Sequence, residues 1–270
     1  MILPPTNNPR FQEAIETVRQ ADTLFVLAGA GLSTAVGVAT YWSEEGSYGD
    51  ETTKYGHTAL EHADASLWRQ DVASQIAYFT DKREQFAAID FPASIYGTLL
   101  GKVEGKDYFC VTSNVDSGFY RAGFDGARLF EVHGSYRVCQ CIKDGLHGIF
   151  PASVAGTLAC PVCGSPTRPN ALFFNDFEFN PKILYAQQYR FNEFWDEVPE
   201  QSRVVILELG VGVTVPKVRQ VGNNLYRDFM TDYIHVNLEP EPEFLFGQFC
   251  PFENRESWVQ AGVTEFIEAL

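Results

Sequence analysis

Residues 23–33 read TLFVLAGAGLS, an apolar run that passes directly into a glycine turn. An apolar run of this length is typical of a parallel strand that is buried on both faces of its sheet. Gly29 and Gly31 have no Cβ atom, so the backbone after this strand can approach a pyrophosphate and meet its charge with N–H groups. Ala30 and Ser33 complete the turn, and Ser33 adds a hydroxyl donor. Glycines at a strand end are also ordinary turn residues, so the interpretation depends on the other motifs of the chain.

Four further apolar runs have the same character and predict more strands of one sheet. A helix that Asn8 caps and Pro9 begins precedes the first strand. Further helices are predicted at residues 66–88, 181–195 and 255–270. Strands that alternate with helices predict an open α/β sheet, in which ligands bind at the carboxyl ends of the strands. The other predicted strands are 108–111, 128–132, 204–209 and 233–237.

The composition limits the class of protein. The chain has 270 residues, 45% of them hydrophobic, which is enough for one large domain or one domain with an insertion. Its formal charge of −15 repels nucleic acid and anionic membrane surfaces. The first residues lack the basic and apolar parts of a secretory signal, and no run of about 20 apolar residues occurs later. We therefore expect a soluble, intracellular protein that binds neither nucleic acid nor a membrane.

Polar side chains follow two of the predicted strands at the point where each strand ends. Asn114 and Asp116 come after the strand that ends at Val111, and together they can present an amide and a carboxylate to a carboxamide and a ribose. An Asx turn is the alternative interpretation of this pair. His133 follows the next strand, where an imidazole can act as a base at neutral pH. Because parallel strands end at one edge of a sheet, the three residues form a candidate site.

Four of the six cysteines form two closely spaced pairs. One residue separates Cys139 from Cys141, two residues separate Cys160 from Cys163, and 18 residues lie between the pairs. Four thiolates fill a tetrahedral zinc site and leave no open position for catalysis, so we predict a structural Zn²⁺ with these four ligands. Buried thiols without a metal are the alternative. Metal ligation also fits a reducing compartment better than a disulfide framework does.

The combination of these motifs resembles the sirtuin family over about residues 20–260. The shared order is Gly-Ala-Gly-x-Ser, Thr-x-Asn-x-Asp, His-Gly, the two cysteine pairs, PNALFFND at 169–176 and VNLE at 236–239. The resemblance implies one domain at residues 1–270 with a Rossmann-like parallel sheet flanked by helices. Within it, the NAD-binding core is expected at 8–40, 105–135 and 200–270, a helical insertion at 41–104 and a small zinc-binding module at 136–175.

Sirtuins consume NAD as a co-substrate, breaking its nicotinamide–ribose bond and passing the ADP-ribosyl group onward. By this resemblance Asn114 and Asp116 hold the nicotinamide and its ribose, and His133 is the general base. NAD and a structural Zn²⁺ are the implied cofactors. The cofactor-binding residues that the resemblance implies are Gly29, Ala30, Gly31, Ser33, Tyr41, Asn114, Asp116, Gly210, Gly212, Asn237 and Glu239.

Departures from the usual sirtuin pattern indicate a subclass. Residues 37–42 (GVATYW) stand where deacylases have Gly-Ile-Pro-Asp-Phe-Arg, and residues 209–213 (LGVGV) replace a Gly-Thr-Ser turn. The runs 208–212 (ELGVG) and 122–125 (AGFD) resemble the class M, macrodomain-linked sirtuins. Those resemble mono-ADP-ribosyltransferases that act on lipoylated carrier proteins in bacteria. His133 stands where class M members are associated with a glutamine, and it keeps deacylation as the alternative.

The resemblance therefore predicts an NAD-dependent transferase with a protein acceptor. Transfer of ADP-ribose to a protein, for example a lipoylated carrier protein, is the first hypothesis. Deacylation of an acyl-lysine protein with His133 as the base is the second, and NAD hydrolysis is the third. A non-catalytic NAD or ADP-ribose sensor is the fourth, and the presence of Asn114, Asp116 and His133 together argues against it.

Overall fold

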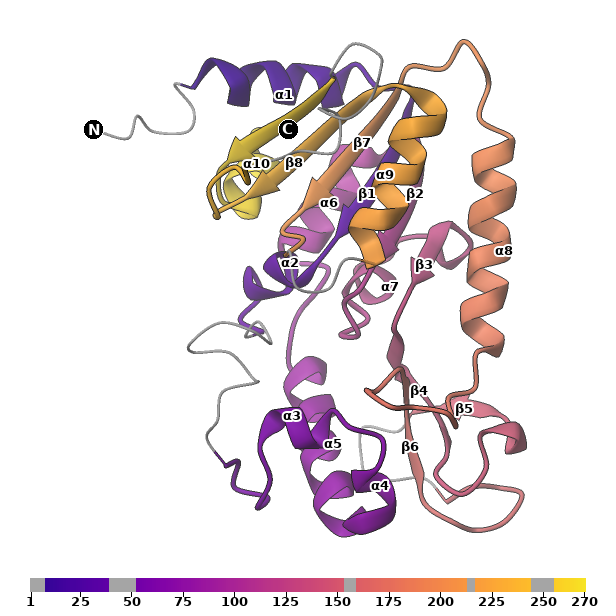
Figure 1. Cartoon of the computed structure of the whole chain (residues 1–270). Coiled ribbons are helices and arrows are strands. Elements are labelled where there is room, and N and C mark those ends of the chain that lie inside the picture. Colours follow the sequence, from indigo (N-terminus) through magenta and orange to yellow (C-terminus); the bar gives the residue numbers. More distant parts are fainter. Residues whose placement is uncertain (1–7, 39–51, 153–158, 213–216, 244–254) are drawn as a thin grey trace.

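The computed structural model describes residues 8–38, 52–152, 159–212, 217–243 and 255–270, and Figure 1 shows how their elements are arranged. The main element is a six-stranded sheet in the order β3-β2-β1-β7-β8-β9, in which all neighbouring strands are parallel. This arrangement confirms the predicted parallel α/β sheet. Its strands are β1 (Thr23–Ala28), β2 (Asp107–Thr112), β3 (Leu129–Glu131), β7 (Val204–Leu209), β8 (Asp232–Asn237) and β9 (Glu256–Gln260).

The strand order reverses between β1 and β7. From β1 the chain builds the sheet outward through β2 and β3, and from β7 it builds outward on the other side through β8 and β9. In open α/β sheets, ligands bind outside the carboxyl ends of the strands at such a switch point. The glycine turn after β1 lies at this position.

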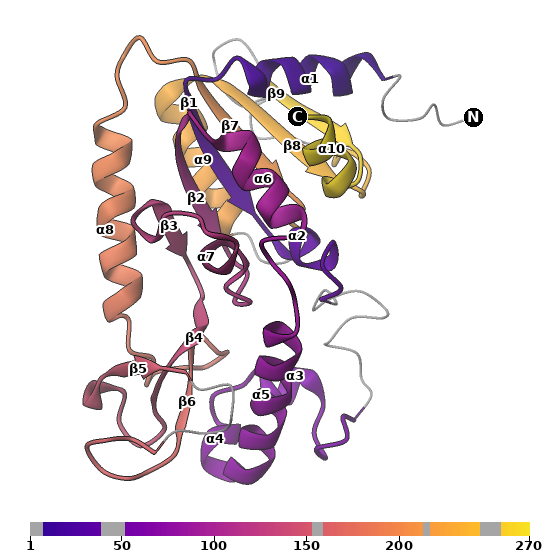
Figure 2. The same ribbon diagram turned by 180° about the vertical axis from the view of Figure 1, so that it is seen from behind.

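Helices cover both faces of the sheet (Figures 1 and 2). Alternate residues of β1 pack into the two layers, with Leu24 and Val26 on one face and Phe25 and Leu27 on the other. Burial on both faces accounts for the apolar character of β1. One face carries α1 (Pro9–Arg19), α6 (Ile95–Val103) and α10 (Val263–Ala269), and the other carries α8 (Lys182–Asp196) and α9 (Lys217–Phe229). Short helices follow two strands as α2 (Ala30–Thr34) and α7 (Gly118–Ala122), and η2 (Gly126–Arg128) precedes β3.

Two separate chain segments form a second unit, which we call the small lobe (Figure 1). They meet at Phe174, whose N–H donates to the Ala63 carbonyl at 2.9 Å and whose carbonyl accepts from the Ala65 N–H at 2.9 Å. Trp68 and Phe173 pack in the apolar cluster that joins them. The first segment holds α3 (Ala59–His62), α4 (Leu67–Gln70) and α5 (Val72–Ala87). The second holds the antiparallel strands β4 (Gly134–Cys141), β5 (Ile149–Pro151) and β6 (Thr167–Ala171), with η3 (Gly145–His147).

Three helical expectations differ from the structure. The sequence predicts one helix at 66–88, but Asp71 divides this stretch into α4 and α5. The sequence predicts one closing helix at 255–270, but Glu256–Gln260 form β9 and the helix covers only Val263–Ala269. Pairing with β8 buries Trp258 and Val259. The free energy gained from this burial outweighs the local preference for a helix. In addition, α6 falls within the predicted insertion at 41–104, yet its buried face packs on the sheet. None of the helices in the described part of the chain has the length and apolar character that a bilayer crossing requires.

Candidate functional site

The turns after β1 and β7 lie directly against each other at the switch point. The Gly31 N–H donates to the Gly210 carbonyl at 2.9 Å, and the Gly29 N–H donates to the Leu209 carbonyl at 3.1 Å. A Cβ on Gly29 would lie 2.6 Å from the Cα of Val211, and one on Gly31 would lie 2.7 Å from the Cα of Gly210. Glycine is therefore required for the approach of two backbones. The N–H groups of both glycines serve this packing, whereas the sequence pattern predicts a pyrophosphate as their partner.

Asn114 is tied to the same turn. The Thr112 hydroxyl donates to the Ala28 carbonyl at 3.1 Å and accepts from the Asn114 N–H at 3.0 Å. The Asn114 side chain is buried, and its Nδ2 donates to the Gly29 carbonyl at 2.9 Å. The loop after β2 and the loop after β1 thus form one unit, as the expectation of a shared sheet edge requires.

Asp116 is buried among hydrogen-bond donors. Its Oδ2 accepts from the Ser33 hydroxyl at 2.5 Å and from the Tyr96 hydroxyl at 3.2 Å, and its Oδ1 accepts from the Gly118 N–H at 2.7 Å. Burial raises the pKa of Asp116, and the three donors oppose that shift only in part. The next residue, Ser117, has φ +65°, a left-handed conformation that is rare outside glycine and that clusters at functional sites.

Tyr96 is a central member of this cluster, and the sequence pattern did not point to it. It is fully buried in α6, and its hydroxyl lies 3.3 Å from Asn114 Nδ2 and 3.4 Å from Ser33 Oγ, in addition to its bond with Asp116. Burial raises the pKa of Tyr96 well above its usual value, so the phenol stays protonated. The available signal was a tyrosine on the apolar face of a helix, because a buried phenol needs a polar partner.

His133 lies in the turn between β3 and β4 and is partly buried. A hydrogen bond with the backbone of Ser113 connects its ring to the loop that carries Asn114. Burial lowers the pKa of His133, the bond with Ser113 opposes this shift, and the charge of Lys217 adds to it. The imidazole is therefore neutral at pH 7 and able to accept a proton.

The predicted residues beyond β7 gather around Val211. Asn237, at the end of β8, donates its Nδ2 to the Val211 carbonyl at 3.1 Å, and its Oδ1 accepts from the Glu239 N–H at 3.2 Å. Glu239 and Gly212 are exposed at this edge of the sheet. Of the other two predicted residues, Ala30 begins α2, and Tyr41 lies outside the described residues.

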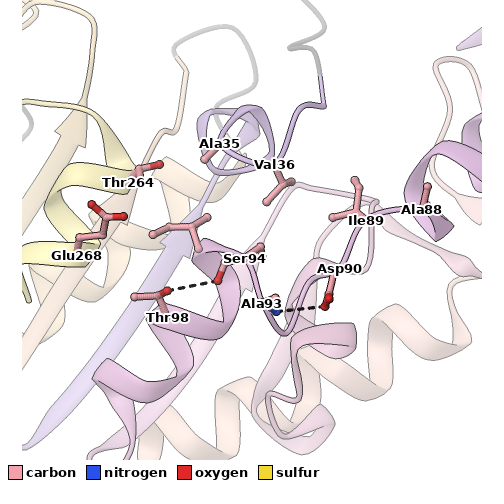
Figure 3. A pocket seen from close by; sticks show the side chains of 11 residues that line it. Ala35, Val36, Ala88, Ile89, Asp90, Ala93, Ser94, Thr98, Thr264 and Glu268 are labelled. Atoms are coloured by element: carbon pink, nitrogen blue, oxygen red, sulfur yellow. Dashed lines mark hydrogen bonds between the residues drawn. The ribbon is translucent and has the colours of Figure 1, made fainter.

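A hollow of 490 Å³ opens beside the end of α2, between α6 and α10 (Figure 3). Two of its polar wall groups already have partners, since the Thr98 hydroxyl donates to the Ser94 carbonyl at 3.4 Å and Asp90 accepts from the Ala93 N–H at 3.2 Å. Asn114 and Asp116 do not line it. The hollow is therefore separate from the buried polar cluster.

The small lobe brings four metal-ligating side chains together. The ligand atoms of Cys141, His147, Cys160 and Cys163 lie within 4.8 Å of one another. Three thiolates and one imidazole form a donor set that suits tetrahedral Zn²⁺. The Lys143 N–H donates to the Cys141 sulfur at 3.3 Å, an interaction that favours the thiolate a metal requires. This cluster fits the predicted small zinc-binding module.

The fourth member of this group is His147, whereas the sequence predicts Cys139. Cys139 and Cys141 lie two residues apart on the extended strand β4, which separates their backbones by roughly 7 Å. The Cys139 sulfur instead contacts the Pro151 carbonyl at 3.7 Å. The chain after β4 turns back through η3 and places His147 Nδ1 3.6 Å from the Cys160 sulfur. A histidine shortly after the first cysteine pair was the available sequence signal.

Asp116→Asn is expected to raise the melting temperature of the ligand-free protein at pH 7. Because burial raises the pKa of Asp116, the neutral form favours the folded state, and that stability is lost as the pH rises through this pKa. An amide of the same shape removes the buried charge at every pH. Thermal denaturation checks the result, with the exposed Asp125→Asn as the control. A melting temperature below that of the wild type would contradict it.

Comparisons with known proteins show the family of this chain. A family model described as Sir2 family matches residues 29–190, so the chain belongs to the Sir2 family, and the predicted sirtuin membership is confirmed. The protein ADP-ribosyltransferase of Staphylococcus aureus is 27% identical over 224 residues, which cover 74% of this chain and 68% of that protein. An NAD-dependent protein deacylase of Thermus thermophilus is 25% identical over 177 residues, which cover 62% of this chain and 64% of that protein.

A solved structure has the same fold. The crystal structure of a Sir2 homolog–NAD complex aligns with a TM-score of 0.71 at 19% sequence identity, and the alignment covers 96% of this chain and 91% of that chain. At 19% sequence identity, this likeness shows that the two chains share a fold. Its coverage takes in both the six-stranded sheet and the small lobe.

Proposed function

We propose that this protein consumes NAD and transfers its ADP-ribosyl group to a protein acceptor. The observation that carries the proposal is the buried cluster of Ser33, Tyr96, Asn114 and Asp116 beside the glycine turn at the switch point. An enclosed carboxylate suits the stabilisation of positive charge that develops on a ribose as nicotinamide leaves. The relative from Staphylococcus aureus, named as a protein ADP-ribosyltransferase, supports this class of reaction.

Each residue has a role in this proposal. Asn114 orients the nicotinamide carboxamide, and Asp116 faces the ribose carbon from which nicotinamide departs. Ser33 and Tyr96 fix the rotamer of Asp116 through their hydroxyl groups. The proposed NAD-contacting set is Gly29, Ala30, Gly31, Ser33, Tyr41, Asn114, Asp116, Gly210, Gly212, Asn237 and Glu239.

Deacylation of an acyl-lysine protein is the second candidate, and His133 favours it. A neutral imidazole beside Ser113 is suited to deprotonate a ribose hydroxyl after the acyl oxygen has attacked the ribose carbon. The relative from Thermus thermophilus, named as an NAD-dependent protein deacylase, supports this candidate. The two reactions share the cleavage of NAD and differ in the nucleophile that attacks the ribose.

A lipoylated carrier protein is the first acceptor to test. This choice rests on residues 208–212 and 122–125, whose sequences resemble class M sirtuins. An acetyl-lysine peptide is the matched substrate for the second candidate. Both are proteins or peptides, in agreement with the protein substrates that the names of the relatives state.

The deciding experiment incubates the purified protein with NAD labelled in its ADP-ribose part and offers the two substrates in parallel. Label on the carrier supports ADP-ribosyl transfer. O-acyl-ADP-ribose with no labelled protein would overturn it in favour of deacylation, and free ADP-ribose alone would indicate NAD hydrolysis. Binding of NAD without any product would indicate a non-catalytic NAD sensor.

His133→Ala separates the two leading functions. In a deacylase the base is required, so its loss should lower activity about 100- to 10,000-fold. In a transferase, NAD binding and part of the transfer should remain, because Asn114 and Asp116 still activate the nicotinamide bond. The rate of labelled carrier formation and the rate of deacetylation, measured on the same preparations, check this. Complete loss of carrier labelling in a variant that still binds NAD contradicts the first hypothesis.

A further inference from the structure

A buried ionic network crosses the second half of the sheet. His235 on β8 lies between two carboxylates, with its Nδ1 2.9 Å from Glu208 on β7 and its Nε2 2.7 Å from Glu256 on β9. The three side chains are 1–2% exposed. The Tyr233 hydroxyl donates to the second oxygen of Glu208 at 2.8 Å. Four polar side chains thus meet between the sheet and α9, where apolar packing is the rule.

The neighbours of Glu208 and His235 favour the charged form of each side chain. Burial alone raises the pKa of Glu208, but His235 and Arg219 outweigh it and lower that pKa to about 2. Burial alone lowers the pKa of His235, but the carboxylates of Glu208 and Glu256 raise it. Buried ion pairs contribute little net stability, because desolvation offsets their attraction.

The network ends on the turn that supports the nucleotide site. One Arg219 nitrogen, at the start of α9, donates to Glu208 at 2.6 Å and to the Val211 carbonyl at 2.8 Å. The same carbonyl accepts from Asn237. Val211 lies between Gly210 and Gly212, and its Cα is the atom that a side chain on residue 29 would meet. Arg219 thereby connects the buried carboxylate to the backbone against which the glycine turn packs.

We propose that Arg219, held in place by Glu208, is a positioning residue for nucleotide binding. It fixes the Val211 carbonyl and with it the turn at residues 210–212, so that the loops after β1 and β7 are in place before NAD arrives. The inference rests on the proposed function, since it assumes that NAD binds at these loops. Lysine cannot replace arginine here, because its single ammonium on a flexible stem lacks the second nitrogen, Nε, which contacts both Glu208 oxygens at 3.3 Å and orients the nitrogen that reaches Val211.

The test compares Arg219→Gln and Arg219→Lys with Arg227→Gln, which changes an exposed arginine on the same helix. Calorimetric titration with ADP-ribose is expected to give a Kd raised about 10- to 100-fold in Arg219→Gln, the size expected for a lost charged hydrogen bond. The Kd of Arg219→Lys should also be raised, and that of Arg227→Gln should match the wild type. The KM for NAD should rise more than kcat falls.

Thermal melts of the same proteins test whether a weaker Kd results from partial unfolding of the variant. Titrations are made only well below each melting temperature, where every variant is folded. Wild-type affinity in folded Arg219→Gln and Arg219→Lys would overturn the inference while leaving the proposed function intact. A fall in kcat as large as the rise in KM, together with a lowered melting temperature, would assign Arg219 a purely structural role and would also overturn it. A wild-type protein that binds neither NAD nor ADP-ribose would refute the proposed function itself.

Discussion

Asn114→Ala is expected to lower the rate of nicotinamide release from NAD about 100- to 1000-fold, the usual effect of removing one polar group that acts on the transition state. Asn114 is buried, and its Nδ2 contacts both the Gly29 carbonyl and the Tyr96 hydroxyl. Its removal therefore loosens the loop that carries Asp116. It also removes the proposed contact with the nicotinamide carboxamide. Because transfer, deacylation and hydrolysis all begin with this cleavage, the loss should be the same for every acceptor.

The measurement is kcat/KM for nicotinamide release. Asn224→Ala, an exposed position on α9, is the matched control. Retention of the native fold is checked by the melting temperature and by bound zinc. Activity of Asn114→Ala within a few-fold of the wild type would place the chemistry outside this cluster.

Cys160→Ser and His147→Ala are each expected to lose the bound zinc, whereas Cys139→Ser keeps it. Structural zinc contributes about 10–16 kcal/mol of apparent binding free energy in small zinc domains, so its loss should unfold the small lobe. The expectation follows from the four ligand atoms within 4.8 Å, a group that includes His147 and not Cys139. Metal analysis of unchelated protein should give one zinc per wild-type chain.

Cobalt substitution adds a readout that is independent of activity, because charge-transfer absorption depends on the number of thiolate ligands. The spectrum should be that of three thiolates and should be unchanged in Cys139→Ser. Loss of metal from Cys139→Ser together with normal zinc content in His147→Ala would restore the four-cysteine set predicted from the sequence.

The sheet could be predicted from the sequence because its signals are local. Residues 23–28 are buried along their whole length, and an apolar run of this kind between turn residues is seldom anything but an inner strand. The residues after the strands were also predictable: Asn114, Asp116 and His133 follow predicted strands, and parallel strands bring their carboxyl ends to one edge. The turn after β7 was harder to predict, because only tertiary packing places Gly210 against Gly31.

The supporting side chains could not be predicted for the same reason. Tyr96 belongs to the site only because α6 lies over the loop of Asn114, and Arg219 only because α9 begins beside Val211. His147, and not Cys139, lies with the other three candidate ligands because the chain reverses through η3, a turn that cysteine spacing does not reveal. Residues that act through a neighbour depend on which elements meet, and that information is spread over the whole chain.

His133 lies at the junction between the sheet and the small lobe, and this position affects its alignment with the loop of Asn114. The chain passes from the sheet to the small lobe through the turn that contains His133, and Gly134 fixes this joint with φ +72° and no room for a side chain beside the Asn170 carbonyl. Asn114 lies in the loop after β2, while the backbone of His133 continues into β4. The alignment of the imidazole with the loop of Asn114 therefore depends on how the small lobe is seated against the sheet, and a tilt of the lobe would change it.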